Sequence, residues 1–159
     1  MEKYYAGIGA RDTPLWAINL ITAISSKLQI DGYILRSGGA DGADTAFARS
    51  VEHKEIFRPE HAIPESLVHA ERFHPNWYEL PNYVKKLHAR NSQIILGKNL
   101  DSPVKFAICW TKNGKAVGGT GQAIRVCEYY NISVFNIADS ETLHRFKSYL
   151  GIKPIESIL

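Results

Sequence analysis

The chain has 159 residues, which is about the length of one domain, and we expect a single domain over residues 1–159. Hydrophobic residues make up 45% of the chain and charged residues 22%, which excludes a disordered or fibrous protein. The formal net charge of +3 is small, so it does not by itself favour broad electrostatic binding to DNA.

The expected compartment follows from the cysteines and the apolar stretches. Cys109 and Cys127 exclude a disulfide scaffold, a CxxC redox motif and a four-cysteine zinc site, and their neighbours suit buried, reduced thiols. The longest uncharged stretch, residues 13–26, is too short to span a bilayer. The first residues lack the hydrophobic region of a signal peptide. We therefore expect a cytoplasmic protein with no membrane partner.

Short strand-forming runs alternate with helical patterns along the chain. The predicted strands are residues 4–8, 33–36, 54–57, 104–110 and 133–137. The predicted helices are residues 14–31, 41–52, 82–96, 118–130 and 140–150. This alternation predicts a three-layer α/β Rossmann-like fold, with a mostly parallel sheet of about five strands and helices on both faces.

Local signals mark the start of the first helix and one long irregular segment. Thr13 is expected as the N-cap of that helix, with Pro14 at its first position. Residues 58–81 are rich in proline, histidine and aromatic residues, with one short helix near residues 65–73. A loop of this length is usually functional or mobile, so it could cover a site as a lid. The alternative is a packed surface loop, which we favour for Trp77.

Glycine clusters follow three of the predicted strands. The first is Gly7-Ile8-Gly9, the second runs from Gly38 to Gly42, and the third runs from Gly118 to Gly121. In a parallel sheet the carboxyl ends of the strands share one edge, and ligands bind outside that edge where the strand order reverses. We therefore expect the three clusters to converge on one anion-binding crevice.

The strongest of these signals is the segment Ser37-Gly38-Gly39-Ala40-Asp41-Gly42-Ala43-Asp44, which leads into a predicted helix. Its glycines let the backbone approach a ligand closely, and the free N–H groups of the helix start suit a phosphate. Asp41 and Asp44 would repel a phosphate, so we expect them to cap the helix or to hold ribose hydroxyls. The alternative is a tight turn with an aspartate N-cap and no ligand.

Other candidate ligand-binding residues lie at the remaining strand ends and in the predicted helix of residues 82–96. Residues 118–121 offer a second glycine turn at a helix start, although no Gly-Lys-Ser/Thr follows as in a Walker loop. Arg11 and Arg90 suit bidentate phosphate recognition, with solvated surface arginines as the alternative. Trp110, at the end of a strand, could stack on a base. The candidates are Gly9, Arg11, Ser37, Gly38, Gly39, Asp41, Asp44, Arg90, Asn91, Trp110, Gly118, Gly119, Thr120 and Gly121.

The spacing of residues along the sequence identifies neither catalytic nor metal-binding residues. The serines and threonines near the clusters have no neighbour in sequence that would mark them as activated nucleophiles. The carboxylates near the expected site are Asp41, Asp44 and Glu128. The six histidines show no HExxH or other metal-binding spacing, so we expect no metal and no cofactor.

Together, these motifs resemble the SLOG superfamily of Rossmann-like nucleotide-binding domains, and most of all its DNA recombination-mediator protein A (DprA/Smf) branch. The resemblance covers residues 4–137. Residues 9–11 are similar to that branch's Gly-x-Arg, residues 37–44 to its Ser-Gly-x-Ala-x-Gly-x-Asp turn, and residues 90–91 to its helical Arg-Asn pair. Residues 118–121 resemble the Gly-Gly-x-Gly turn of the whole superfamily. Small stand-alone phage and bacterial proteins with this pattern are described as DprA-like.

The resemblance implies a protein that binds a nucleotide or a nucleotide-derived small molecule, such as a signalling nucleotide, and that forms homo-oligomers. If the protein is phage-encoded, its expected location is the cytoplasm of the host cell. One alternative is a nucleoside 5′-monophosphate phosphoribohydrolase. Those enzymes carry the motif Pro-Gly-Gly-x-Gly-Thr-x-x-Glu. This chain has Val117 in place of the Pro, Gln122 in place of the Thr and Arg125 in place of the Glu. Glu128 or Asp41 would therefore have to supply the catalytic carboxylate.

The other alternative is a DprA-like recombination mediator that binds single-stranded DNA. Proteins of the DprA branch carry further domains around the Rossmann core, for which we expect no room in 159 residues. Single-stranded DNA is therefore a possible partner that only the family likeness suggests. The nucleotide remains the leading expectation.

Overall fold

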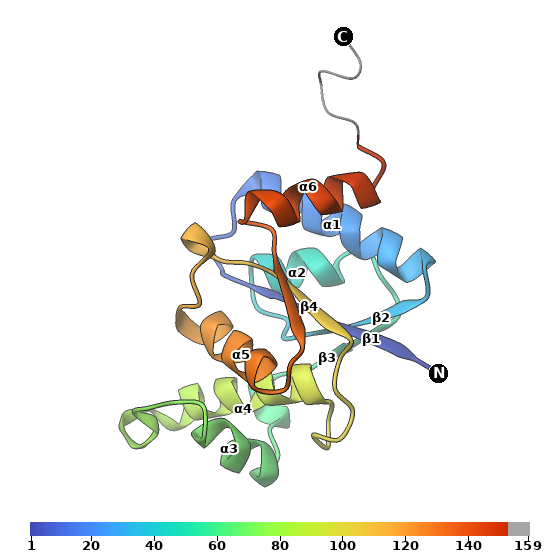
Figure 1. The fold of residues 1–159 in the computed structure, drawn as a ribbon. Coiled ribbons are helices and arrows are strands. Elements are labelled where there is room, and N and C mark those ends of the chain that lie inside the picture. The colour runs from blue at the N-terminus through green and yellow to red at the C-terminus, as the bar shows by residue number, and fades with distance from the viewer. Residues whose placement is uncertain (153–159) are drawn as a thin grey trace.

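Five parallel strands form a single sheet (Figure 1). The strands are β1 (Lys3–Gly9), β2 (Tyr33–Ser37), β3 (Lys54–Ile56), β4 (Phe106–Trp110) and β5 (Ser133–Asn136). Their order is β3-β2-β1-β4-β5, and every pairing between neighbours is parallel. The structure, a computed structural model, describes residues 1–152, so the end of the expected domain, residues 153–159, lies outside the described residues.

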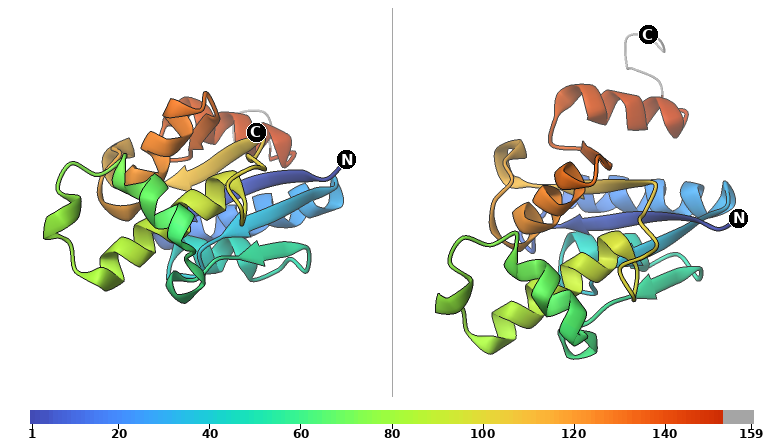
Figure 2. Two further views of the ribbon diagram at one scale, coloured as in Figure 1. Left: turned by 90° about the horizontal axis from the view of Figure 1, so that it is seen from below. Right: turned by 60° about the horizontal axis from the view of Figure 1, so that its bottom comes forward.

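Helices cover both faces of the sheet (Figures 1 and 2). The helices are α1 (Leu15–Ile30), α2 (Ala43–Ala48), α3 (Pro64–Glu71), α4 (Asn82–Leu96), α5 (Gly118–Tyr129) and α6 (Ser140–Tyr149). α1, α2 and α6 pack on one face, α4 and α5 pack on the other, and α3 packs against α4. The predicted three-layer α/β fold is confirmed. None of the helices within residues 1–152 has the length and apolar character needed to cross a membrane.

Side chains of the central strands alternate between two hydrophobic cores. In β1, Tyr5 faces the core beneath α1 and α2, whereas Ala6 and Ile8 face the core beneath α4 and α5. In β4, Ile108 lies in the first core and Cys109 in the second. A strand that is buried on both faces needs a nearly continuous apolar run, which explains the sequence pattern that predicted β4.

The structure corrects the predicted start of α1. Thr13 is not its N-cap, because the hydroxyl of Thr13 donates to the carbonyl of Ala10. Pro14 precedes the helix in an extended conformation, and α1 has no side-chain cap. The hydroxyl therefore closes the loop after β1 instead of starting the helix.

α2 is shorter than the predicted helix over residues 41–52. Gly42 has a φ of 87°, which is not a helical conformation, so the helix begins after it. At the other end, the N–H groups of Glu52 and His53 donate to the side chain of Gln29. These donors are lost to the helix, and the chain turns into β3 instead.

The irregular segment of residues 58–81 contains α3 and two short 3₁₀ helices, Pro59–His61 and Trp77–Glu79. Ala70 of α3 and Trp77 are buried together against Ala89 of α4. The prediction that Trp77 is a packed residue is confirmed. Much of the segment therefore covers α4, and only its first residues reach the carboxyl edge of the sheet.

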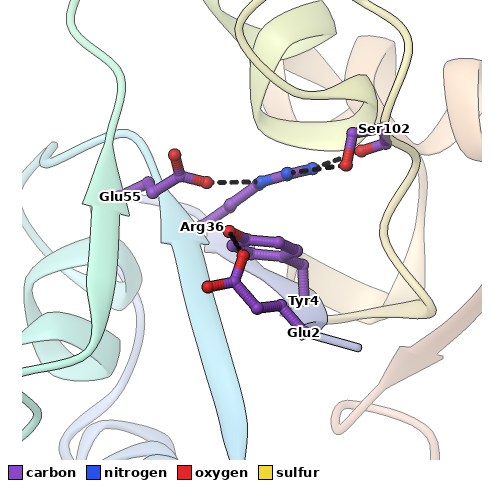
Figure 3. A network of polar contacts seen from close by, with 5 residues as sticks. All are labelled: Glu2, Tyr4, Arg36, Glu55 and Ser102. Carbon is purple, nitrogen blue, oxygen red and sulfur yellow. Dashed lines mark hydrogen bonds and ion pairs between the residues drawn. The ribbon is translucent and has the colours of Figure 1, made fainter.

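A buried arginine in β2 links the sheet to the loop after α4 (Figure 3). Arg36 is 3% exposed, and its Nε donates to Oε1 of Glu55 at 2.8 Å. Its Nη2 donates to Oγ of Ser102 at 3.1 Å, and its Nη1 donates to the carbonyl of the same serine. The guanidinium carbon lies 3.9 Å from the centre of the Tyr4 ring. The hydrogen bonds to Glu55 and Ser102 use three different nitrogens, which only the planar, forked guanidinium of an arginine provides.

Arg36→Lys is expected to lower the free energy of unfolding by about 2 kcal/mol, because an ammonium group cannot serve Glu55 and Ser102 together. Urea denaturation measures the change. Glu55→Gln is the control: its side chain is 43% exposed, so loss of the ion pair alone should cost less than about 1 kcal/mol. Equal losses in the two variants would show that the contacts with Ser102 contribute little.

Candidate functional site

The strand order reverses between β1 and β4. The chain leaves β1 toward β2 and leaves β4 toward β5, so the loops after these strands diverge and open a crevice at the carboxyl edge of the sheet. A pocket of about 410 Å³ lies there, which we call the switch-point pocket. It is lined by residues 8–11, by residues 117–120, by Leu87, Arg90 and Asn91 of α4, and by Ala40, Asp44 and Ala123.

A smaller pocket of about 230 Å³ adjoins it over the end of β2. This pocket, which we call the β2 lobe, is lined by residues 38–41, by residues 58–60 and by Tyr83. Four residues line both pockets: Arg11, Ala40, Leu87 and Arg90. The switch-point pocket and the β2 lobe are therefore two parts of one crevice.

The structure brings the three glycine-containing loops together at this crevice. Arg11 of the first loop shares the switch-point pocket with Gly119 of the third loop and shares the β2 lobe with Gly39 of the second. The predicted site residues that line the crevice are Gly9, Arg11, Gly38, Gly39, Asp41, Asp44, Arg90, Asn91, Gly118, Gly119 and Thr120.

Three predicted site residues line neither pocket. The buried hydroxyl of Ser37 donates to the carbonyl of Gly7 at 2.6 Å, which joins β2 to β1. Trp110 packs in the core beneath α1 and α2, so its ring offers the crevice no stacking surface. A Cβ at Gly121 would lie 2.5 Å from the carbonyl carbon of Ala116, so glycine is needed there for close packing. Packing explains these three residues better than ligand contact does.

The turn that the sequence predicts for a phosphate holds the protein's own carboxylate. Asp44 is 5% exposed, and its Oδ2 accepts the N–H of Ala40 at 3.3 Å. Neither Asp41 nor Asp44 caps α2, which has no side-chain cap and only six residues. Because N–H groups of this turn already serve the carboxyl group of Asp44, they are not free to bind an anionic ligand.

The pKa of Asp44 is high for an aspartate. Burial raises this pKa from 3.8 to about 6, and the guanidinium of Arg90 and the backbone N–H groups of Ala40, Gly38 and Gly9 offset only part of the rise. A carboxyl group that titrates near neutral pH can give or take a proton under physiological conditions. Because it also lines a pocket, Asp44 is a candidate for acid–base chemistry.

Arg90 joins α4 to the ends of two strands. It is 8% exposed, and its Nη1 donates to the carbonyls of Gly38 at 2.6 Å and of Phe57 at 3.3 Å. A Cβ at Gly38 would overlap the guanidinium, so glycine is needed for this close approach. Arg90 therefore shapes the second loop and also lines both pockets.

The N-terminus of α5 opens into the switch-point pocket. Val117 precedes the helix without a side-chain cap, and the N–H groups of residues 118–120 have no partner in the described part of the chain. Asn91 holds this turn in place, because its Nδ2 donates to the carbonyl of Gly119 at 3.1 Å and to Oε1 of Gln122 at 3.3 Å. Free N–H groups and the helix dipole both favour an anion at this position.

No protein-family model, no curated protein and no solved structure matches this chain. The likeness to the SLOG superfamily therefore rests on the sequence motifs alone. Across residues 1–152, the structure gathers no group of three or more His, Cys, Asp or Glu side chains that could hold a metal ion. The chemistry of the crevice is that of its arginines, its buried carboxyl group and the start of α5.

Sequence reasoning missed three polar residues of the crevice, Arg58, Glu60 and Tyr83. Arg58 comes shortly after β3, as Arg11 comes shortly after β1, so its position after a strand was a usable signal. The lack of a glycine cluster beside Arg58 hid that signal. Tyr83 lies in the first turn of α4 and carries no local signal, because only the packing of α4 brings it to the β2 lobe.

A buried contact between a serine and a histidine lies outside the crevice. Nδ1 of His69 is 2.8 Å from Oγ of Ser92, and Nε2 of His69 is 2.9 Å from the hydroxyl of Tyr130. These residues are far apart in the sequence, so spacing gave no sign of the contact. Ser92 is fully buried, which keeps any substrate from its hydroxyl. We interpret this group as a polar link between α3, α4 and the end of α5.

Another pocket, of about 480 Å³, lies beneath α6 at the amino edge of the sheet. Aromatic rings dominate its lining, among them Tyr33, Phe106 and Phe135. No side chain of α6 is buried, so the pocket is the space beneath a loosely packed helix. Ligands of parallel α/β sheets bind at the carboxyl edge, and we therefore place the candidate site in the crevice.

Proposed function

We propose that this protein binds a nucleotide or a nucleotide-derived small molecule in the crevice. One observation carries the proposal: Arg11, Arg90 and the free N–H groups at the start of α5 line the same switch-point pocket. Cationic side chains and a helix N-terminus together suit a phosphate group. The SLOG-like motifs favour the same class of ligand.

The switch-point pocket also offers surface for the rest of a nucleotide. Ile8, Leu87 and Val117 supply apolar contacts beside the groups that attract a phosphate. A volume of about 410 Å³ lies within the range of small-molecule sites. A phosphate at residues 118–120 would leave the sugar and the base against this apolar wall.

Arg11→Gln is expected to weaken nucleotide binding at least about tenfold, because a hydrogen bond to a charged group contributes roughly 1.5–3 kcal/mol. Arg11 is exposed, so the variant should fold normally. Titration calorimetry with nucleoside monophosphates, nucleoside diphosphates, cyclic nucleotides and ADP-ribose measures the affinity.

Arg49→Gln is the matched control for this experiment. Arg49 is also exposed, but it follows the C-terminus of α2 and lines neither pocket. Its replacement removes the same charge and should leave the affinity unchanged. Equal binding by the wild type and Arg11→Gln would place the ligand elsewhere, and a lack of binding across the whole panel would overturn the proposal.

A phosphoribohydrolase is the second candidate, because Asp44 lines the same pocket and has a pKa of about 6. Hydrolysis of an N-glycosidic bond needs an acid for the leaving base, or a carboxylate that stabilises the developing positive charge and directs water. Glu128 lines a different pocket together with Arg72 and Tyr129, and Asp41 is exposed in the β2 lobe. We therefore assign this role to Asp44.

Chromatography distinguishes an enzyme from a binding protein. AMP, GMP, CMP and UMP are incubated with the wild type and with Asp44→Asn, and free base and ribose phosphate are measured. Release by the wild type alone supports a hydrolase that uses Asp44, whereas no release from any nucleotide rules this candidate out. A gel shift with single-stranded oligonucleotides at roughly physiological salt tests DNA as a partner.

A further inference from the structure

The β2 lobe concentrates positive charge. Arg58 reaches it from the segment after β3, Arg11 from the loop after β1, and Arg90 from α4. Burial lowers the pKa of Arg90, the negative charges of Asp44 and Tyr83 raise it in part, and repulsion by Arg11 and Arg58 lowers it further. Three like charges around one small pocket destabilise one another while no anion lies between them.

None of these three arginines forms an ion pair within residues 1–152, although the carboxyl group of Asp44 is close enough to Arg90 to raise its pKa. Within residues 1–152 the structure forms two ion pairs, Lys27–Asp31 and Arg36–Glu55, and none of those residues lines the crevice. The β2 lobe does contain two acidic residues, at positions 41 and 60, but neither lies within ion-pair distance of an arginine. The positive charge of the lobe is therefore available to a ligand.

The two parts of the crevice offer separate donors to an anion. The start of α5 lines the switch-point pocket but not the β2 lobe, whereas Arg58 lines the lobe but not the switch-point pocket. Gly39 brings the second loop against Arg58, since a Cβ there would lie 3.1 Å from Nη1 of Arg58. Arg11 and Arg90 line both parts. A phosphate in the switch-point pocket at the start of α5 therefore leaves Arg58 and the β2 lobe available to a second anion.

We propose that the ligand is a nucleotide with two linked phosphate groups, as in a nucleoside diphosphate. One phosphate lies at the start of α5 and the other lies in the β2 lobe beside Arg58, while Arg11 and Arg90 contact both. The inference rests on the proposed function and names the substrate class of the same site. It also gives Arg58 a role as the residue that distinguishes a diphosphate from a monophosphate.

The test compares monophosphates with diphosphates of the same base in magnesium-free buffer. Titration calorimetry of the wild type should show at least one base for which the diphosphate binds about tenfold or more tightly than the monophosphate. Arg58→Gln should reduce the diphosphate affinity to about that of the monophosphate and leave monophosphate binding unchanged. Arg49→Gln, the matched control, should keep the full preference.

The outcomes separate the inference from the proposed function. Equal affinity for monophosphates and diphosphates in the wild type would overturn the inference while leaving nucleotide binding intact. The same holds if Arg58→Gln weakens both classes equally. Failure of the wild type to bind any nucleotide would overturn the proposed function, and the inference with it. Arg58 is exposed, and a melting curve of the variant confirms that it is folded.

Discussion

At pH 8, Asp44→Asn is expected to have a free energy of unfolding about 3 kcal/mol above that of the wild type. Burial raises the pKa of Asp44 from 3.8 to about 6 in the folded protein. Ionisation of this carboxyl group is therefore less favourable in the folded state than in the unfolded chain. Asparagine keeps the shape and carries no charge, but it offers one acceptor oxygen, instead of two, to the N–H groups of Ala40, Gly38 and Gly9.

The direction of the pKa shift defines the pH range of this effect. Because the folded pKa lies above the unfolded value, the wild type loses stability as the pH rises from 3.8 to about 6, and the loss is complete above that range. Below it, both states hold the proton and the two proteins should be equally stable. Urea denaturation at about pH 3.5, 5, 6 and 8 measures the difference.

Parallel stability curves for the two proteins over this range would contradict the assignment of a buried, charged Asp44. If Asp44→Asn gains stability and loses activity or ligand affinity, the carboxylate is retained for function at a cost in stability. The same variant thus connects the stability of the fold with the chemistry of the crevice.

Gly42→Ala is expected to lower the free energy of unfolding by about 4 kcal/mol or more, and to abolish nucleotide binding. The φ of 87° and ψ of −124° at Gly42 form a conformation that residues with a Cβ rarely adopt. A Cβ there would lie 2.5 Å from the carbonyl oxygen of Ala10 and 2.8 Å from Cα of Arg11. Both are backbone atoms, so relief requires the loop that carries Arg11 to move.

Gly114→Ala is the control that isolates backbone strain from steric overlap. Gly114 also has a positive φ, of 68°, but no atom lies within 4 Å of a Cβ at that position. Its replacement should cost only about 1 kcal/mol. Thermal unfolding and nucleotide titration of both variants give the comparison. A loss in Gly42→Ala as small as in Gly114→Ala would show that the loop after β1 relaxes easily.

The fold was predictable from the sequence because its main signals are local. Apolar runs mark the strands, three- and four-residue spacing marks the helices, and glycine marks the turns between them. The errors arose where competing hydrogen bonds decide where a helix begins or ends. Thr13 bonds to Ala10 instead of capping α1, and Gln29 takes the N–H groups that a longer α2 would need.

The convergence of the three glycine-containing loops was also predictable, because parallel strands bring the loops that follow them to one edge. The internal chemistry of the crevice was not predictable from the sequence. The N–H groups of the second loop serve the buried carboxyl group of Asp44, and this burial depends on packing by α4 and the loop after β1. Tyr83 reaches the crevice through the packing of α4, which no short motif encodes, and Arg58 lacks the neighbouring glycine cluster that marks the other loops. The identity of the ligand stays a prediction.

The outermost strands of the sheet are very short, with three residues in β3 and four in β5. Such edges leave few free backbone groups with which another copy could extend the sheet. The homo-oligomer that the SLOG likeness implies would therefore have to assemble through helix surfaces. Leu15 and Trp16, at the start of α1, are 73% and 48% exposed and follow closely on the loop that carries Arg11. Self-association there would place a neighbouring protomer close to the loop that carries Arg11.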